Sequence, residues 1–467
     1  MVCVDVGSTF TKAVLVDLAD GALLATAAHP TTLPGLAGHT DVLDGVAAVR
    51  DAVFADAGMA PRTVRAAELL LCSSAGGGLR LAVVGYERVV TAEAGHRVAL
   101  SAGGKVVHVA SGMLDAEGVA ALRASRPDIV LLVGGTDGGN ADVLVRNARR
   151  IGIARLRVPV VVAGNADAAT DAAAELTRRG CRVTVTANVL PRIGVLDPLP
   201  SRAAIREAFL DHVIGGKGLS TGTLDGVRFA DLVRAPTPDV VLAGVEVLAD
   251  GAVGSGVQGS GDVLVVDVGG ATTDVYSVIT PSGEDVALRK DVVAPLWRAR
   301  TVEGDLGMRW GATGVVEAAG TEGLLDPADG GPAGHAELAR HAEQVTASPG
   351  FLPADAAGRA VDVRLAALAV RVAARRHARA TTPTGTPRPL RDVGLVVGSG
   401  GVLRHADDAA RRQILGPLLT DHAGGWPVPD RARLAVDQRY VLFAAGLLSA
   451  QAPVAAARLA AALTWLS

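Results

Sequence analysis

Two short stretches of this 467-residue chain carry residue types suited to binding phosphate and a divalent cation. In each, an apolar strand is predicted to deliver an aspartate, Asp5 or Asp267, at its carboxyl end, and glycines then let the backbone approach a ligand. Backbone N–H groups of such a turn form a nest for phosphate oxygens, and Mg²⁺ takes one or two carboxylates. Asp5 and Asp267 are therefore candidate metal ligands and catalytic residues. The other candidates for phosphate binding lie in these turns or directly after them: Gly7, Ser8, Thr9, Thr11, Lys12, Gly269, Gly270, Thr272 and Thr273.

Lys12 would add a point charge for the outer phosphates. One such stretch alone is equally well explained as an ordinary hairpin with a glycine turn, because short glycine motifs often occur by chance. Two copies, one in each half of the chain, favour an internal repeat with a shared function.

A third glycine turn follows the apolar stretch 393–397. It consists of Gly398, Ser399, Gly400 and Gly401, and a sequence typical of a helix, VLRHADDAARRQIL, comes directly after it. A glycine turn at the start of a helix is a generic site for nucleotides.

These three elements, in this order, resemble the superfamily of acetate and sugar kinases, heat-shock chaperone ATPases and actin. The resemblance implies an α/β, actin-like (ribonuclease H-like) two-domain ATPase fold. It further implies that the two hairpins grip the phosphates of Mg²⁺-ATP from opposite domains and that the third turn holds the adenosine. Glu246 falls roughly where relatives place a catalytic base or water-orienting residue, and a solvated glutamate on a helix face is the alternative.

Several longer stretches are similar to the glutamate mutase L family, presumed reactivating ATPases that accompany adenosylcobalamin-dependent glutamate mutase. That family is unrelated to the mismatch-repair protein of similar name. The stretches extend over essentially the whole chain and read LLLCSSAGGGLR, TAEAGHRVALSAG, LLVGGTDGGN, VVVAGNADA, ANVLPRIGVLDP and RTVEGDLGMRWG. The resemblance implies a chaperone-like reactivase whose partners are the subunits of such a mutase. A small-molecule kinase, which would need an aspartate base facing an acceptor hydroxyl, and an actin-like scaffold are the alternatives.

Strands and helices alternate regularly between about residues 105 and 188, which predicts a small parallel sheet with crossover helices. We expect this region to be an inserted domain, residues 101–235, within an actin-like domain I formed by residues 1–100 and 236–260. Residues 261–467 would form domain II. The GGTDGGN stretch, residues 134–140, is interpreted either as a tight loop or as a contact surface for the partner enzyme.

Three further interpretations concern polar segments. The stretch 300–307 is expected to begin a helix capped by Thr301 or Asp305. Glu303 and Asp305 would then lie near the ribose or the metal, and an exposed capped helix is the alternative. The arginines between Arg371 and Arg391 are expected to form a solvated surface. Residues 322–356 are expected to be exposed loops.

Composition excludes several classes of function. A formal charge of −3 and 3% aromatic residues argue against nucleic-acid binding. Cys3, Cys72 and Cys181 are far apart and match no zinc motif, which predicts buried thiols in a reducing compartment. The tail 440–467 is interpreted as buried helices rather than a membrane span. The chain is therefore expected to be cytoplasmic, and self-association into a homo-oligomer stays open.

Overall fold

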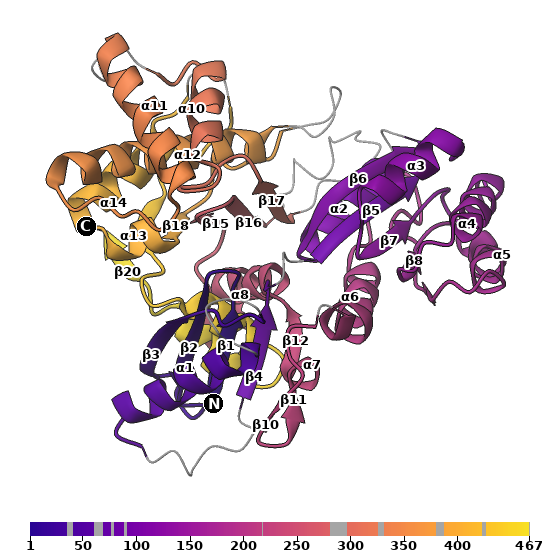
Figure 1. Ribbon diagram of the computed structural model, residues 1–467, viewed down its shortest axis with the longest axis horizontal. Helices are drawn as coiled ribbons and strands as arrows, with labels where there is room; N and C mark the ends of the chain where they lie inside the picture. The colour runs from indigo at the N-terminus through magenta and orange to yellow at the C-terminus, as the bar shows by residue number, and fades with distance from the viewer. Residues whose placement is uncertain are drawn as a thin grey trace. The chain divides into compact units, whose positions relative to one another are not determined.

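The computed structural model describes residues 1–34, 41–59, 69–75, 79–87, 91–216, 218–280, 297–325, 331–379, 387–422 and 426–466 (Figure 1). The described residues fall into two compact units. Unit 1 contains those of Met1–Gly244 and Phe443–Leu459, and unit 2 contains those of Val245–Gly283, Trp297–Leu442 and Ala460–Ser467.

The first sheet of unit 1 has the strand order β12-β4-β1-β2-β3. Three strands form an antiparallel meander, and two more run parallel to the first of these on its other side. All five residues of β1 are buried, as expected for a central strand covered on both faces. The strands are β1 (Val2–Val6), β2 (Phe10–Val16), β3 (Leu23–Pro30), β4 (Leu69–Ser73) and β12 (Val233–Pro236).

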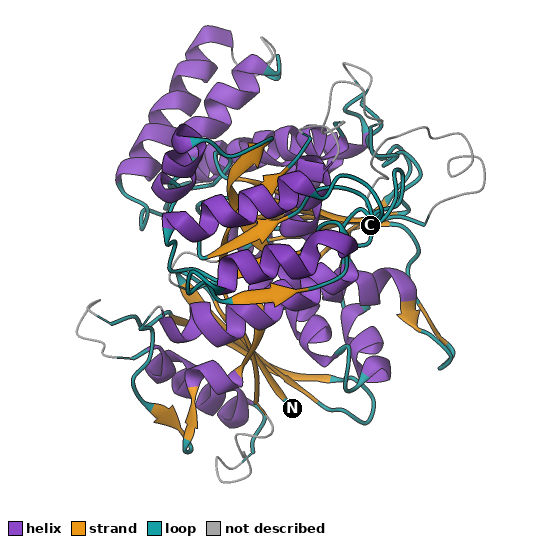
Figure 2. Cartoon of the chain, turned by 90° about the vertical axis from the view of Figure 1, so that its right-hand side faces the viewer, coloured by secondary structure: helices purple, strands orange, loops and turns teal. Residues whose placement is uncertain are grey.

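The second sheet of unit 1 is entirely parallel, with the order β6-β5-β7-β8-β9. It contains the four strands expected after residue 105, together with one strand that precedes them. The strands are β5 (Leu79–Gly85), β6 (Gly104–Ser111), β7 (Ile129–Leu132), β8 (Val160–Val162) and β9 (Val183–Val185). Figure 2 distinguishes the helices and strands of the chain by colour.

Helices of unit 1 connect and cover these sheets. Asp41 caps α1 (Val42–Asp56) by accepting a hydrogen bond from the Leu43 amide. The other helices are α2 (Thr91–Ser101), α3 (Ala116–Ala124), α4 (Asp142–Ala154), α5 (Ala166–Thr177), α6 (Leu199–Ala208) with the π-helical turn η3 (Phe209–Ile214), and α7 (Phe229–Leu232). Three helices contain boundaries between the two units along the chain: α8 (Thr237–Asp250) at Gly244, α15 (Val441–Leu448) at Phe443 and α16 (Pro453–Ala460) at Leu459. Two-residue strands form two small hairpins, β10 (Thr223–Leu224) with β11 (Val227–Arg228) in unit 1 and β13 (Gly251–Ala252) with β14 (Val257–Gln258) in unit 2.

The sheet of unit 2 repeats the first sheet of unit 1 and adds one strand, in the order β17-β16-β15-β18-β19-β20. Here too a three-stranded meander is followed by two strands parallel to its first strand. The strands are β15 (Val263–Val268), β16 (Thr273–Val278), β17 (Arg298–Glu303), β18 (Leu395–Ser399), β19 (Arg433–Val436) and β20 (Thr464–Leu466). The helices are α10 (Ala312–Thr321), α11 (Gly331–Ala347), α12 (Ala356–Ala378), α13 (Gly401–His405), α14 (Asp408–Leu415) and the 3₁₀ turn η5 (Gly416–Leu419).

The shared strand order is that of the ribonuclease H-like fold, once in each unit. The predicted actin-like α/β fold and the internal repeat are therefore confirmed by the topology of the chain itself. No helix in the described ranges is both long enough and apolar enough to cross a membrane.

Three expectations were wrong. Residues 300–303 lie in β17 and pair with β16, so they do not begin a helix. Residues 331–347 form α11 instead of a loop, since Pro332 occupies the first turn, where a proline is tolerated. Four of the arginines expected on a solvated surface, Arg371, Arg375, Arg376 and Arg379, are engaged in ion pairs, and Arg375 is only 4% exposed. Arg391 is exposed, as expected.

Helix packing in unit 1 depends on a glycine in α15. A Cβ atom on Gly446 would lie 1.9 Å from the Val240 carbonyl oxygen of α8. We predict that Gly446→Ala lowers the free energy of unfolding by about 1–3 kcal/mol, because the overpacking cost exceeds the helix propensity gained. Gly320→Ala in α10 is the matched control, since its new Cβ would make only ordinary contact at 3.7 Å. Urea unfolding followed by circular dichroism measures both. Equal midpoints for the two variants would contradict the close packing.

Candidate functional site

The first predicted turn is a tight hairpin between β1 and β2. The Gly7 amide donates to the Phe10 carbonyl oxygen at 3.1 Å, and a Cβ on Gly7 would lie 2.7 Å from that oxygen. Only glycine therefore fits the first position of this turn. Asp5 pairs with Lys12 across the two strands.

Asp5 is surrounded by polar groups although it is only 6% exposed. The Thr237 hydroxyl donates to Asp5 Oδ1 at 2.6 Å, and the Cys72 thiol lies 3.6 Å from the same oxygen. Lys12 Nζ is 3.9 Å from Oδ2. Burial, followed by the charge of Asp5, raises the pKa of the Cys72 thiol well above its ordinary value, so the thiol stays neutral.

Thr237 is a site residue that the sequence reasoning missed. It follows β12, which runs parallel to β1 and β4, so its side chain belongs to the same edge of the sheet as Asp5. A polar residue directly after a short apolar strand was the available signal, but nothing in the sequence pairs that strand with β4.

The carbonyl groups of this turn are held from behind by Thr31. Its hydroxyl donates to the Gly7 carbonyl at 2.9 Å and its amide donates to the Thr9 carbonyl at 2.9 Å. Because Thr31 uses its single hydroxyl proton on Gly7, the Thr11 hydroxyl, 3.2 Å away, donates to Thr31. Thr11 is fully buried, and its hydroxyl therefore positions Thr31, whereas Ser8 and Thr9 are exposed in the turn.

The second turn repeats this geometry. The Gly269 amide donates to the Thr272 carbonyl oxygen at 2.9 Å, and a Cβ on Gly269 would lie 2.9 Å from that oxygen. Asp267 is half-buried and pairs across the strands with Asp274, which takes the place that Lys12 has in the first hairpin. Arg300 neutralises Asp274 at 2.6 Å.

The segment 304–311, GDLGMRWG, packs behind the second turn and will be called the buttress. The Met308 amide donates to the Gly269 carbonyl at 3.0 Å, and the amides of Arg309 and Trp310 donate to the Gly270 carbonyl at 2.8 and 3.0 Å. A Cβ on Gly307 would lie 2.4 Å from the Ala271 carbonyl carbon, so this close packing requires a glycine at position 307.

The hydroxyl groups near the second turn are bonded to protein atoms. Thr273 is buried and its hydroxyl donates to the Leu306 carbonyl at 2.7 Å, so it fastens the buttress to β16. The Thr272 hydroxyl donates to Asp274 at 3.2 Å. Thr272 and Thr273 thus stabilise the turn and its support in this structure.

Holding the carbonyl groups fixes the direction of the amides. In a trans peptide group the C=O and the following N–H point in opposite directions. The bonds to the carbonyls of Gly269 and Gly270 therefore direct the N–H groups of Gly270 and Ala271 away from the buttress. Within the described residues no hydrogen bond engages these two amides or those of Ser8 and Thr9. Two such turns, each beside an aspartate, fit phosphate oxygens and Mg²⁺.

The third turn lies beside the second hairpin, because β18 pairs with β15 and places Ser399 next to Asp267. Gly400 has a φ of +103°, and a Cβ there would lie 2.1 Å from the Val268 carbonyl oxygen. A Cβ on Gly401, by contrast, would meet nothing within 4 Å. Gly398 and Ser399 are buried in the end of β18. The predicted helix after the turn is two short helices, α13 and α14, separated at Ala406 and Asp407.

Asp437 and Glu246 are two further acidic residues near the ends of these elements or within α8. Asp437 follows β19 and accepts hydrogen bonds from the Val441 and Leu442 amides at 2.7 and 3.2 Å, which caps the start of α15. Glu246 is half-buried in α8, nine residues after Thr237, a rise of about 13 Å along the helix. Its assignment as a catalytic residue stays a prediction. No group of three or more His, Cys, Asp or Glu side chains suited to a metal occurs in the described part of the chain.

The GGTDGGN loop is part of a rigid polar edge of the parallel sheet. The Asn188 side chain donates to Asp137 at 2.8 Å, and the Gly138 amide donates to Asp167 at 3.0 Å. These bonds join the loops that follow β7, β8 and β9. Residues 137–140 are exposed on this edge, and a role in partner binding stays a prediction.

Comparison with known proteins identifies the family. The family described as MutL protein matches residues 1–463 of the chain. Protein MutL of Clostridium tetanomorphum is 34% identical over 471 residues, which cover 97% of this chain and 97% of that protein. The chain belongs to the MutL protein family. The family resemblance predicted from motifs such as GGTDGGN and TVEGDLGMR is thereby confirmed.

Solved structures give low similarity scores. A glycerol dehydratase reactivase has a TM-score of 0.35 at 12% identity and covers 96% of this chain and 99% of its own. Xylulose kinase from Bifidobacterium adolescentis has a TM-score of 0.32 at 10% identity, covering 100% and 95%. ROK hexokinase from Thermus thermophilus has a TM-score of 0.28 at 13% identity, covering 98% and 97%. The fold assignment rests on the strand order instead.

The hydrogen bond between Thr237 and Asp5 is directly testable. We predict that Thr237→Val lowers the free energy of unfolding by about 1.5–3 kcal/mol, the scale of a hydrogen bond to a charged group, since Asp5 is almost fully buried. Thr237→Ser keeps the hydroxyl and should retain most of the parent stability. Chemical unfolding of the three proteins provides the measurement. A Thr237→Val protein as stable as the parent would show that this hydroxyl does not matter to Asp5.

Proposed function

We propose that this protein binds and hydrolyses Mg²⁺-ATP and uses the hydrolysis, as a chaperone-like reactivase, to restore an adenosylcobalamin-dependent mutase of the glutamate mutase type. The ATP site is inferred from the repeated hairpin. In each unit an aspartate is followed by a turn in which two amides make no hydrogen bond within the described residues. Membership in the MutL protein family supports the mutase partner.

Each residue type has a distinct role in this proposal. The amides of Ser8, Thr9, Gly270 and Ala271 donate to phosphate oxygens. The carboxylates of Asp5 and Asp267 would hold Mg²⁺ or its water ligands, and an ion bound there would supply positive charge beside the transferring phosphoryl group. Lys12, next to Asp5, supplies positive charge to the phosphates already in the ground state. The turn 398–401 is assigned to the adenosine.

The geometry disfavours a small-molecule kinase. Such an enzyme needs an aspartate or glutamate base available to an acceptor hydroxyl. Asp274 is paired with Arg300 at 2.6 Å, and Asp437 accepts two amides of α15. Neither of these acids is available as a base. Glu246, the other candidate base, lies about 13 Å along α8 from Thr237, the neighbour of Asp5.

Substitution of Asp267 separates binding from turnover. We predict that Asp267→Asn still binds ATP but hydrolyses it about 10²–10³-fold more slowly, the scale for loss of one electrostatic stabiliser of a transition state. It should also fail to revive an inactivated mutase supplied with free cofactor and ATP. Equilibrium binding, phosphate release and mutase activity are the three readouts.

Two lysine variants provide the contrast for this experiment. Lys12→Ala should weaken ATP affinity because Lys12 acts on charge present before the reaction. Lys105→Ala removes an exposed lysine of β6 and should leave binding and hydrolysis unchanged. Undiminished revival by Asp267→Asn would show that hydrolysis does not drive reactivation. ATP-dependent phosphorylation of a small acceptor by the parent protein would favour the kinase.

A glycine pair tests the adenosine site. Mg²⁺-ATP should raise the melting temperature, since it binds only the native protein, and we predict that Gly401→Val abolishes this rise. The side chain has open space around it, so the nucleotide-free variant should melt like the parent. Gly350→Val, another exposed glycine with nothing within 4 Å, is the control and should retain the rise. Gly400→Val is unsuitable, because its positive φ and the Val268 carbonyl would strain the fold. An unchanged rise in Gly401→Val would place the adenosine elsewhere.

A further inference from the structure

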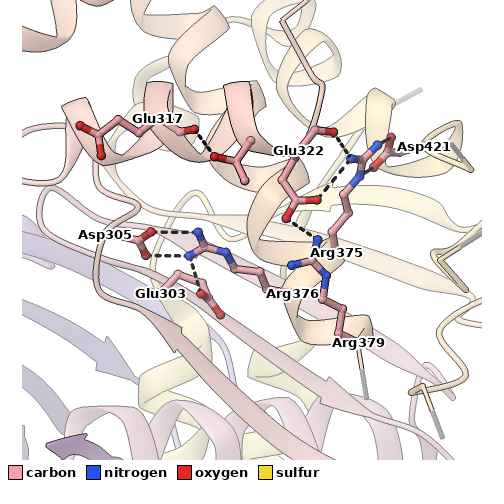
Figure 3. Close-up of polar contacts among 9 residues, drawn as sticks. Glu303, Asp305, Glu317, Glu322, Arg375, Arg376, Arg379 and Asp421 are labelled. Atoms are coloured by element: carbon pink, nitrogen blue, oxygen red, sulfur yellow. Dashed lines mark hydrogen bonds and ion pairs between the residues drawn. The ribbon is translucent and has the colours of Figure 1, made fainter. Parts of the chain in front are cut away.

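Arg376 of α12 holds both sides of the bend where β17 enters the buttress. Its Nη1 donates to Glu303 Oε2 at 2.9 Å and to Asp305 Oδ1 at 2.7 Å, while Nη2 donates to Asp305 Oδ2 at 2.9 Å (Figure 3). The contact with Asp305 is thus bidentate, the geometry that fixes an arginine and a carboxylate most firmly. Burial raises the pKa of Glu303, and Arg376 opposes that shift; at Asp305 the hydrogen bond and charge of Arg376 outweigh burial and lower the pKa.

The bend leads within a few residues to the second phosphate turn. The Leu306 carbonyl accepts the Thr273 hydroxyl, and the amides of Met308, Arg309 and Trp310 then bind the carbonyls of Gly269 and Gly270. Since those carbonyls fix the directions of the Gly270 and Ala271 amides, a displacement of the bend is transmitted to the groups that would meet phosphate.

Other residues of α12 secure the same segment. His377 Nδ1 lies 2.9 Å from the Thr301 hydroxyl, and Asp362 accepts a hydrogen bond from Arg309 at 3.1 Å. Both partners flank the bend, one in β17 and one in the buttress. Arg376 is the contact at the bend itself, and it is partly exposed, at 26%.

The neighbouring arginines, Arg375 in α12 and Arg379 directly after it, bind different partners. Arg375 binds Asp421 and the main-chain oxygen of Glu322, and Arg379 binds the Glu322 carboxylate (Figure 3). Arg379 is 35% exposed and touches neither the bend nor the buttress in the described contacts. It therefore provides a matched control for Arg376.

We propose that Arg376 is a positioning residue for ATP hydrolysis, which orients the amides of Gly270 and Ala271 through Glu303, Asp305 and the buttress. The inference rests on the proposed ATPase function. It assigns the TVEGDLGMR motif and α12 to one rigid support of the phosphate turn, and it places Glu303 and Asp305 in ion pairs with Arg376 instead of at the ribose or the metal.

The test compares Arg376→Met, Asp305→Asn and Arg379→Met with the parent protein. Arg376→Met should lower kcat by about tenfold or more with a smaller change in KM for ATP, because misplaced donors cost most in the transition state. Arg379→Met should keep both constants. Asp305→Asn changes a half-exposed side chain, so it should fold even if Arg376→Met does not. It should also lower kcat.

A double variant distinguishes positioning from general loss of stability. Arg376→Met combined with Asp305→Asn should lose no more kcat than the more affected single variant, because both changes break the same contact. The inference would be overturned if the kcat losses of the two single variants multiplied in the double variant, or if Arg376→Met had the same kcat as Arg379→Met. Either result would leave the proposed ATPase function intact. Absence of Mg²⁺-ATP hydrolysis by the parent protein would instead overturn the proposed function and this inference with it.

Discussion

The planarity of the peptide group is the constraint on which both candidate phosphate turns depend. A turn holds its amides toward an anion most firmly when its carbonyl groups are bound on the opposite side. In each unit the chain supplies donors behind the turn that bind these carbonyls. The supporting segments and the elements that anchor them serve this purpose. Gly7 and Gly269 have a separate cause, because a Cβ would lie 2.7 or 2.9 Å from a carbonyl oxygen of the same turn.

The two units meet the requirement with different chemistry. In unit 1 a single residue, Thr31, binds two turn carbonyls and is itself held by Thr11. In unit 2 three consecutive backbone amides do so, and they belong to a segment that α12 fixes through charged side chains. The first support is local and neutral, whereas the second depends on ion pairs that are partly exposed. The two units therefore share a topology, but the support of the turn in unit 2 depends more on distant residues than the support in unit 1.

The loops at the strand ends of the parallel sheet are also held by hydrogen bonds from other segments. Asparagine and aspartate side chains cross-link three consecutive loops, so the exposed residues 137–140 are held in place without being covered. Rigid exposed backbone reduces the conformational entropy lost on association. That property suits a contact surface for a protein partner, one of the two interpretations of the GGTDGGN stretch.

The sequence by itself determined the features that depend on neighbouring residues. Apolar runs ending in Asp and Gly predicted both hairpins, regular alternation predicted the parallel strands, and family motifs led to the MutL protein family, because each signal lies within a short stretch of chain. Only the tertiary structure decided which distant residues complete the site. Thr237 meets Asp5 across 232 positions, the stretch 300–303 became a strand because β16 was available to pair with it, and the arginines of α12 became ion-paired because acidic side chains from other elements face them. No local pattern encodes these partners, since pairing between elements is selected by the packing of the whole unit.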